Sequence, residues 1–169
     1  MPAFYLLSIW LHVVAAGIWI GGMIFLALVL VPAIRQSEYQ GVSSSLIHIT
    51  GIRFRWVGWI CLVLFPLTGV VNLVYRGVGW EEFWSRSLWQ SPFGRTLAIK
   101  LALFAAILLF SVVHDFFIGP KAADLLESKP SSLDATRLRR EASWIGRFNL
   151  LLALAVVALG VMLARETPL

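Results

Sequence analysis

Three side chains with basic nitrogens lie within or beside long apolar runs of this 169-residue chain: His12, Lys100 and His114. Imidazole and amine nitrogens can bind a metal or haem iron, and an ionisable group in a bilayer is costly unless it is paired or coordinated. His114 follows Lys100 by fourteen residues, which on a helix returns to within about 40° of the same face and advances about 21 Å. One helix therefore presents a nitrogen donor at each of two depths.

The composition identifies the elements that must position these residues. Hydrophobic residues make up 59% of the chain and charged residues 14%, which is typical of an integral membrane protein and not of a soluble domain. We expect an all-α fold, an integral membrane four-helix bundle that forms a single transmembrane domain over residues 1–169. Its helices are predicted at about 4–32, 45–76, 92–118 and 142–165. Between the second and third helices, Trp80, Trp84 and Trp89 predict a short interfacial segment at the headgroup level.

His12 and Lys100 are expected at similar depth. His12 lies about ten residues into the first helix, and Lys100 lies about nine residues beyond Ser91, which is a suitable N-cap for the third. Both helices enter the membrane from the same side. Trp19 and Met23 share the helical face of His12, so Trp19 is predicted to form a wall beside any flat ligand bound there.

At the other depth, His114 meets His48 if the second helix begins early, and Arg147 and Asn149 open the fourth helix nearby. Each of these residues also has a plainer interpretation. His12 can hydrogen-bond to a neighbouring helix, His114 can be a solvated interfacial residue, and Lys100 can extend toward the headgroups. His48 can belong to a loop, and Arg147 and Asn149 can be anchors.

The three glycines of the first helix are interpreted as packing positions. Gly17 and Gly21 form a G-x-x-x-G pattern, which is typical of close helix approach in membranes, and Gly22 follows directly.

The basic residues predict the orientation of the chain. Nine of them fall in the two connections 32–55 and 119–147, against four in the 76–95 connection and near the termini. The positive-inside rule then places both termini outside the cytoplasm in a multi-pass protein of a bacterial inner membrane. In this setting the net charge of +5 indicates a membrane lipid surface and no nucleic-acid partner.

A shift of 88 residues suggests an internal duplication of a helix hairpin, which the sequence leaves open. The shift superimposes Pro32 on Pro120, Trp56 on Trp144, and His12 on Lys100.

The whole chain resembles the CopD, or copper resistance D, family of membrane proteins, and it is also similar to HemJ-type protoporphyrinogen oxidases. The resemblance rests on LHVVAAGIWIGGMIF, RFRWVGWICLVLFPLTGVVNL, KLALFAAILLFSVVHD and WIGRFNLLLALAVVALGV, one in each predicted helix. It implies that the helix 1 histidine and the helix 3 lysine bind a b-type haem, and it places His114, Arg147 and Asn149 on motif positions. Leu150 follows Asn149 where the HemJ pattern has Glu, which argues against porphyrinogen oxidation.

The arrangement is also similar to di-haem four-helix cytochromes b, and our first hypothesis is a protein that binds one or two b-type haems for electron transfer. His12 and His114 are the predicted iron ligands, with Lys100 and His48 as second ligands and Arg147, Asn149 and Trp19 as further cofactor contacts. Such a protein is an electron carrier or membrane subunit rather than a stand-alone enzyme, with redox subunits or a quinone as partners. Its oligomeric state and any catalytic residues stay open.

The alternatives are copper transport or resistance, with Met23 joining the two histidines, and a HemJ-like oxidase. Copper sites usually use several soft sulfur ligands, and this chain contains few of them: Cys61 and three methionines.

Overall fold

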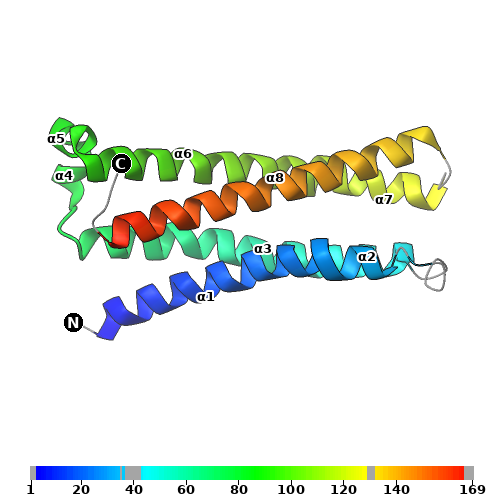
Figure 1. Cartoon of the computed structure of the whole chain (residues 1–169), viewed down its shortest axis with the longest axis horizontal. Helices are drawn as coiled ribbons and strands as arrows, with labels where there is room; N and C mark the ends of the chain where they lie inside the picture. The colour runs from blue at the N-terminus through cyan, green and yellow to red at the C-terminus, as the bar shows by residue number, and fades with distance from the viewer. Residues whose placement is uncertain (1–2, 35, 37–42, 129–131, 166–169) are drawn as a thin grey trace.

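A computed structural model describes residues 3–34, 36, 43–128 and 132–165 of the chain. The regular structure in these residues is helical. Four helical stretches are long and apolar enough to cross a membrane, which confirms the predicted fold class: Ala3–Ile34, Ser45–Val74, Pro92–Ala122 and Thr136–Ala164. Both termini lie at the same end of the bundle (Figure 1), which we call the terminal end; the opposite end is the distal end.

The long helices are interrupted by short segments of wider π-helical turn. The elements in chain order are α1 (Ala3–Phe25), η1 (Leu26–Leu30), α2 (Val31–Ile34), α3 (Ser43–Val74), α4 (Trp80–Trp84), α5 (Arg86–Gln90), α6 (Pro92–Val112), η3 (Val113–Ile118), α7 (Gly119–Ser128) and α8 (Leu133–Ala164). Ser91 starts α6 as predicted, because its side chain accepts a hydrogen bond from the backbone N–H of Gly94 and Pro92 occupies the first turn. The predicted interfacial segment consists of α4 and α5.

Two helices extend beyond their predicted bounds. The fourth begins at Leu133 and not at 142. Its first turns are charged and exposed, so they give no hydropathy signal that would predict them. Arg137 and Glu141 form an ion pair there one turn apart, with 3.0 Å between Nε and Oε1. The second begins at Ser43, so His48 is a helical residue and not part of a loop. The hydropathy of a sequence predicts the part of a helix that lies in the membrane, and the helix itself can continue beyond that part.

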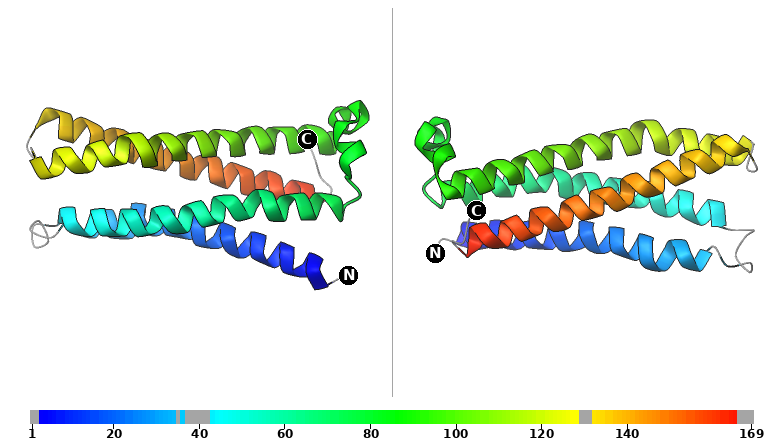
Figure 2. Two further views of the ribbon diagram at one scale, coloured as in Figure 1. Left: turned by 180° about the vertical axis from the view of Figure 1, so that it is seen from behind. Right: turned by 45° about the horizontal axis from the view of Figure 1, so that its top comes forward.

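The bundle is made of two helix hairpins. α1 packs on α3 and α6 packs on α8, and a further contact between α1 and α8 joins the hairpins. Figure 1 shows the α1–α3 pair below the α6–α8 pair, and the left view of Figure 2 shows the same arrangement from behind. The right view of Figure 2, with the top of the bundle tilted forward, shows α8 running between α6 and α1. The buried core runs between the hairpins and contains Ala15, Trp19, Cys61, Leu62, Ile107 and Ala153.

The glycines of α1 divide into two kinds. A Cβ on Gly22 would collide with the Phe54 ring of α3, so this glycine is required for close packing. Nothing lies within 4 Å of a Cβ built on Gly17 or Gly21, and both residues are exposed. The prediction that the G-x-x-x-G pattern packs helices within this chain is therefore wrong, because that face of α1 points away from the other three long helices.

The two hairpins have matching element bounds. Moving α1 by 88 residues gives 91–113, close to the 92–112 of α6, and moving α3 gives 131–162, close to the 133–164 of α8. The π-helical segment η1 moves to 114–118, inside the 113–118 of η3. Buried positions correspond too, since Ser8 maps on Thr96 and Trp19 on Ile107. The structure thus supports the duplication that the sequence suggested.

Candidate functional site

His12 is held by α3 in one defined protonation form. Its Nδ1 lies 2.6 Å from Oγ1 of Thr68, and the same hydroxyl donates its one proton to the backbone carbonyl of Leu64, also at 2.6 Å. The hydroxyl must therefore accept a hydrogen bond from His12, so the ring proton is on Nδ1. This leaves Nε2 with a free lone pair, the form in which histidine binds a metal.

Polar and aromatic neighbours fix the His12 ring further. One turn earlier, Ser8 is buried and lies 3.2 Å from Oδ1 of Asn72, which adds a second polar link between α1 and α3. The Phe65 ring contacts His12 edge-on, with 5.4 Å between ring centroids, and contacts Trp19 at 5.9 Å. Among the described residues, Trp19 belongs to the packed core and is connected to His12 only through Phe65.

Lys100 occupies the corresponding place on the other hairpin. It is partly buried, and its Nζ lies 3.4 Å from the position that a Cβ would take on Gly160 of α8. Its amine is near enough to His12 for the two groups to interact electrostatically when both are charged, so they belong to one region of the bundle. Arg76 closes the terminal end nearby, where Nη1 donates to the carbonyl of Leu163 at 2.8 Å.

These residues fit a b-type haem in donor chemistry. One imidazole and one amine are available at similar depth, and the Phe65 ring, which contacts His12, stands edge to face with Phe104 of α6 at a centroid distance of 6.1 Å. Close backbone contacts join α1 to α3, α6 to α8 and α1 to α8, whereas Phe65 and Phe104 join α3 to α6 through their side chains.

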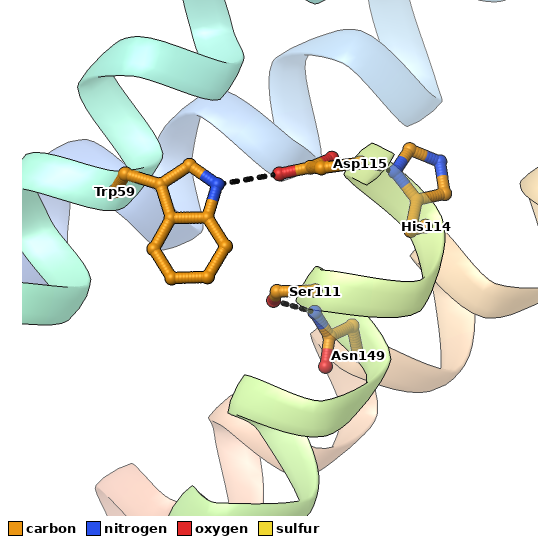
Figure 3. Close-up of polar contacts among 5 residues, drawn as sticks. All are labelled: Trp59, Ser111, His114, Asp115 and Asn149. Atoms are coloured by element: carbon orange, nitrogen blue, oxygen red, sulfur yellow. Dashed lines mark hydrogen bonds and ion pairs between the residues drawn. The ribbon is translucent and has the colours of Figure 1, made fainter. Parts of the chain in front are cut away.

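The distal level contains a second polar cluster, drawn in Figure 3. Oδ1 of Asp115 lies 2.8 Å from Nδ1 of His114, and Oδ2 accepts a hydrogen bond of 3.0 Å from the indole N–H of Trp59. Trp59 and His114 approach the carboxylate from opposite sides. In the same view Asn149 of α8 donates to the hydroxyl of Ser111 at 3.0 Å, and Asn149 is buried.

The remaining predicted residues are placed apart from these contacts. His48 is exposed on α3, and Arg147 is exposed with its guanidinium carbon 5.7 Å from the centre of the Trp144 ring. Met23 packs against the core cluster, but it lies eleven residues from His12, about 16 Å along the helix, which is too far for both to bind one ion. The residues described by the structure contain no group of three or more His, Cys, Asp or Glu side chains that would hold a metal ion by themselves.

Sequence reasoning missed three participants: Thr68, Trp59 and Asp115. The separation of 56 positions between Thr68 and His12 hides their contact in the sequence. Asp115 adjoins His114 in the sequence, and an acidic residue at that point of an apolar helix was a usable signal.

Comparisons with known proteins point in one direction. Residues 49–163, more than half of the chain, match the family described as copper resistance protein D. A protein of Aquifex aeolicus (strain VF5), described only as an uncharacterized protein, is 32% identical to this chain over 156 residues. The aligned region covers 92% of the length of each protein. No solved structure matches the chain.

Proposed function

Because this chain belongs to the copper resistance protein D family and presents His12 in a ligand-ready form, we propose that it is a membrane protein that binds b-type haem and transfers electrons. It acts as an electron carrier or as the membrane subunit of a redox assembly. The distal end faces the cytoplasm of a bacterial inner membrane, since most basic residues lie there.

The observation that carries the proposal is the hydrogen-bond chain from His12 to Thr68 to Leu64. A hydrogen bond alone satisfies a partly buried histidine, and the direction of this one also leaves Nε2 free and holds the ring in one orientation, which are the two conditions that a haem ligand must meet. The acceptor for Nδ1–H comes from a different helix, so the packing of α1 on α3 sets that orientation.

Lys100 is the second ligand in this proposal. Haem iron supplies one-electron redox chemistry when bound, and axial ligands and burial set its potential. Lys100 belongs to the same region as His12, and its amine lies against Gly160, where the missing side chain gives it room. A neutral Lys100 amine would be able to bind the iron, and it would avoid the cost of burying a charge in low-dielectric surroundings.

The test is the reduced-minus-oxidised absorption spectrum of the protein purified after expression with ample haem. We expect haem bands in the wild type, their loss in His12→Ala, and in Lys100→Met a shifted spectrum, because one of the two proposed ligands would change while His12 remains. His48→Ala is the matched control, since it removes an exposed histidine and leaves the spectrum unchanged. A wild-type protein without haem bands, or equal spectra in all variants, would refute the proposal.

Copper handling is the second candidate, and the family match favours it. Copper is then the transported substrate. Cys61 and Met23 supply soft sulfur donors in one region, because Cys61 belongs to the core cluster and Met23 packs against it, while His12 lies further along the bundle.

Copper content after incubation with Cu(I) separates the two functions. Met23→Leu is expected to lower retained copper, and Met162→Leu serves as its matched control because Met162 lies elsewhere in the chain. No copper in the wild type would exclude this function.

A further inference from the structure

Two buried side-chain atoms in the described residues have no hydrogen-bond partner: Oδ1 of Asn149 and Nε of Arg55. Buried polar atoms are normally paired in proteins, so an unpaired one requires an explanation such as a bound molecule. One is an acceptor and the other is a donor. Both belong to the distal half of the bundle.

The contacts of these two residues place them in one column. Asn149 bonds to Ser111 of α6, and a guanidinium nitrogen of Arg55 lies 3.3 Å from the position that a Cβ would take on Gly119. Asp115 lies between Ser111 and Gly119, four residues from each, and it accepts the Trp59 indole. The helix α6–η3–α7 thus carries one side of the column.

Helix α3 carries the other side. Arg55 and Trp59 are four residues apart and project from the same face, toward Gly119 and Asp115 respectively. Phe116 adds a ring with its centroid 5.8 Å from that of Trp59. We call Arg55, Trp59, Ser111, Asp115 and Asn149 the distal column.

The duplicated hairpin shows that the fold does not need polar groups here. The positions 88 residues before Ser111 and Asp115 are Met23 and Ala27, and the position before Asn149 is the buried Cys61. The first hairpin fills the corresponding places with apolar or weakly polar side chains. The polar set is specific to the second hairpin and to the face of α3 that packs on it.

The chemistry of the column selects its ligand. A cation is disfavoured by Arg55, and an anion is disfavoured by the Asp115 carboxylate, so the ligand is neutral. The ligand must carry an acceptor for the N–H of Arg55 and a donor for Oδ1 of Asn149. A flat ring in the ligand can pack on the aromatic rings of Trp59 and Phe116. The ligand must also reach the site from the bilayer.

We propose that the distal column binds the headgroup of a lipid-soluble para-quinone and its quinol. The quinone carbonyl accepts from Arg55, and the quinol hydroxyl donates to Asn149 Oδ1 or to the Asp115 carboxylate. The binding itself does not depend on haem. A role of this quinone as the electron donor or acceptor of the protein rests on the proposed function.

Quenching of tryptophan fluorescence by a short-chain ubiquinone and by a short-chain menaquinone tests binding to the haem-free protein in neutral lipid nanodiscs. We expect saturable quenching in the wild type and affinity about tenfold weaker in Arg55→Gln, because a hydrogen bond from a charged donor is lost. Arg53→Gln is the matched control: it removes the same charge two residues away at an exposed position, and its affinity stays within about twofold of the wild type.

A second variant guards against misfolding. Asn149→Leu keeps the branching and the number of non-hydrogen atoms of the side chain and removes its acceptor and its amide donor, so it is expected to bind the quinol form more weakly. Thermal unfolding identifies any variant that has lost its fold. Equal quinone quenching in wild type and Arg55→Gln overturns the proposal. So does equal competition by quinol in wild type and Asn149→Leu, or an absence of saturable quenching in the wild type.

The same experiment separates this proposal from the haem proposal. His12→Ala is expected to lose haem and to keep quinone binding, because it lies at the other depth. If Arg55→Gln instead weakens binding of anionic phospholipid and leaves quinone binding unchanged, the column is a lipid headgroup site and the quinone proposal is refuted.

Discussion

Replacement of Thr68 by valine is the sharpest test of the His12 site. The two side chains have nearly the same shape, so the substitution removes the hydroxyl that accepts the Nδ1 proton of His12 and changes little else. His12 then either keeps an unpaired buried N–H or moves the proton to Nε2, which blocks the lone pair. Both outcomes weaken binding of haem iron.

The magnitude follows from the buried group that is left unpaired. An unsatisfied buried donor costs about 1–3 kcal/mol, which corresponds to roughly 5- to 150-fold in affinity at about 1.4 kcal/mol per factor of ten. Loss of an outer-shell partner of a metal-binding histidine typically costs about 10–100-fold. We therefore expect haem affinity to fall by about 10–100-fold, measured by titrating haem into the haem-free protein at its Soret absorbance.

Two further variants make the result decisive. Thr68→Ser keeps the hydroxyl and is expected to bind haem as the wild type does. Thr50→Val removes a hydroxyl that makes the same type of bond to a carbonyl four residues earlier in α3, but that contacts no histidine. Equal haem affinity for Thr68→Val and Thr50→Val would show that the tautomer argument is wrong.

Two more predictions concern packing and the terminal end. Gly22→Ala places a methyl group in the Phe54 ring and is expected to destabilise the protein by about 1–3 kcal/mol, whereas Gly21→Ala, with open space around it, is expected to raise the midpoint of thermal unfolding slightly, because alanine is the better helix former. Equal midpoints for the two variants would contradict the packing of α1 on α3. Arg76→Gln removes the donor to the Leu163 carbonyl and is expected to cost about 1 kcal/mol, seen as faster amide exchange at the end of α8; unchanged exchange there would argue against this cap.

Hydropathy and helix signals predicted most of the fold. The four spans, the Ser91 cap and the interfacial helices follow from local sequence, because length, apolar content and capping residues act within one element. The start of α8 was missed since a charged helix outside the membrane gives no hydropathy signal. The G-x-x-x-G pattern failed because a motif of small residues shows which face can pack closely and does not show what lies opposite.

The site was only partly predictable for a related reason. The depth argument placed His12 and Lys100 in one region, because depth depends on position along each helix. Which residue of the next helix receives the His12 proton depends on the rotation of α3 about its axis, and single-sequence periodicity fixes that rotation poorly when all faces are apolar. Thr68 and Trp59 therefore emerged only from the structure.

The duplication bears on how many haems the bundle holds. His12 and Lys100 stand 88 residues apart, so the repeat puts them at equivalent positions of the two hairpins, with one nitrogen from each facing the shared space. At the distal level the equivalent of His114 is Leu26, which offers no ligand, and His48 is exposed. Under the proposed function, a pair of nitrogen ligands on opposite hairpins is therefore expected at one level alone among the described residues. On that proposal the repeat favours one haem near the terminal end and leaves the distal half to a different ligand.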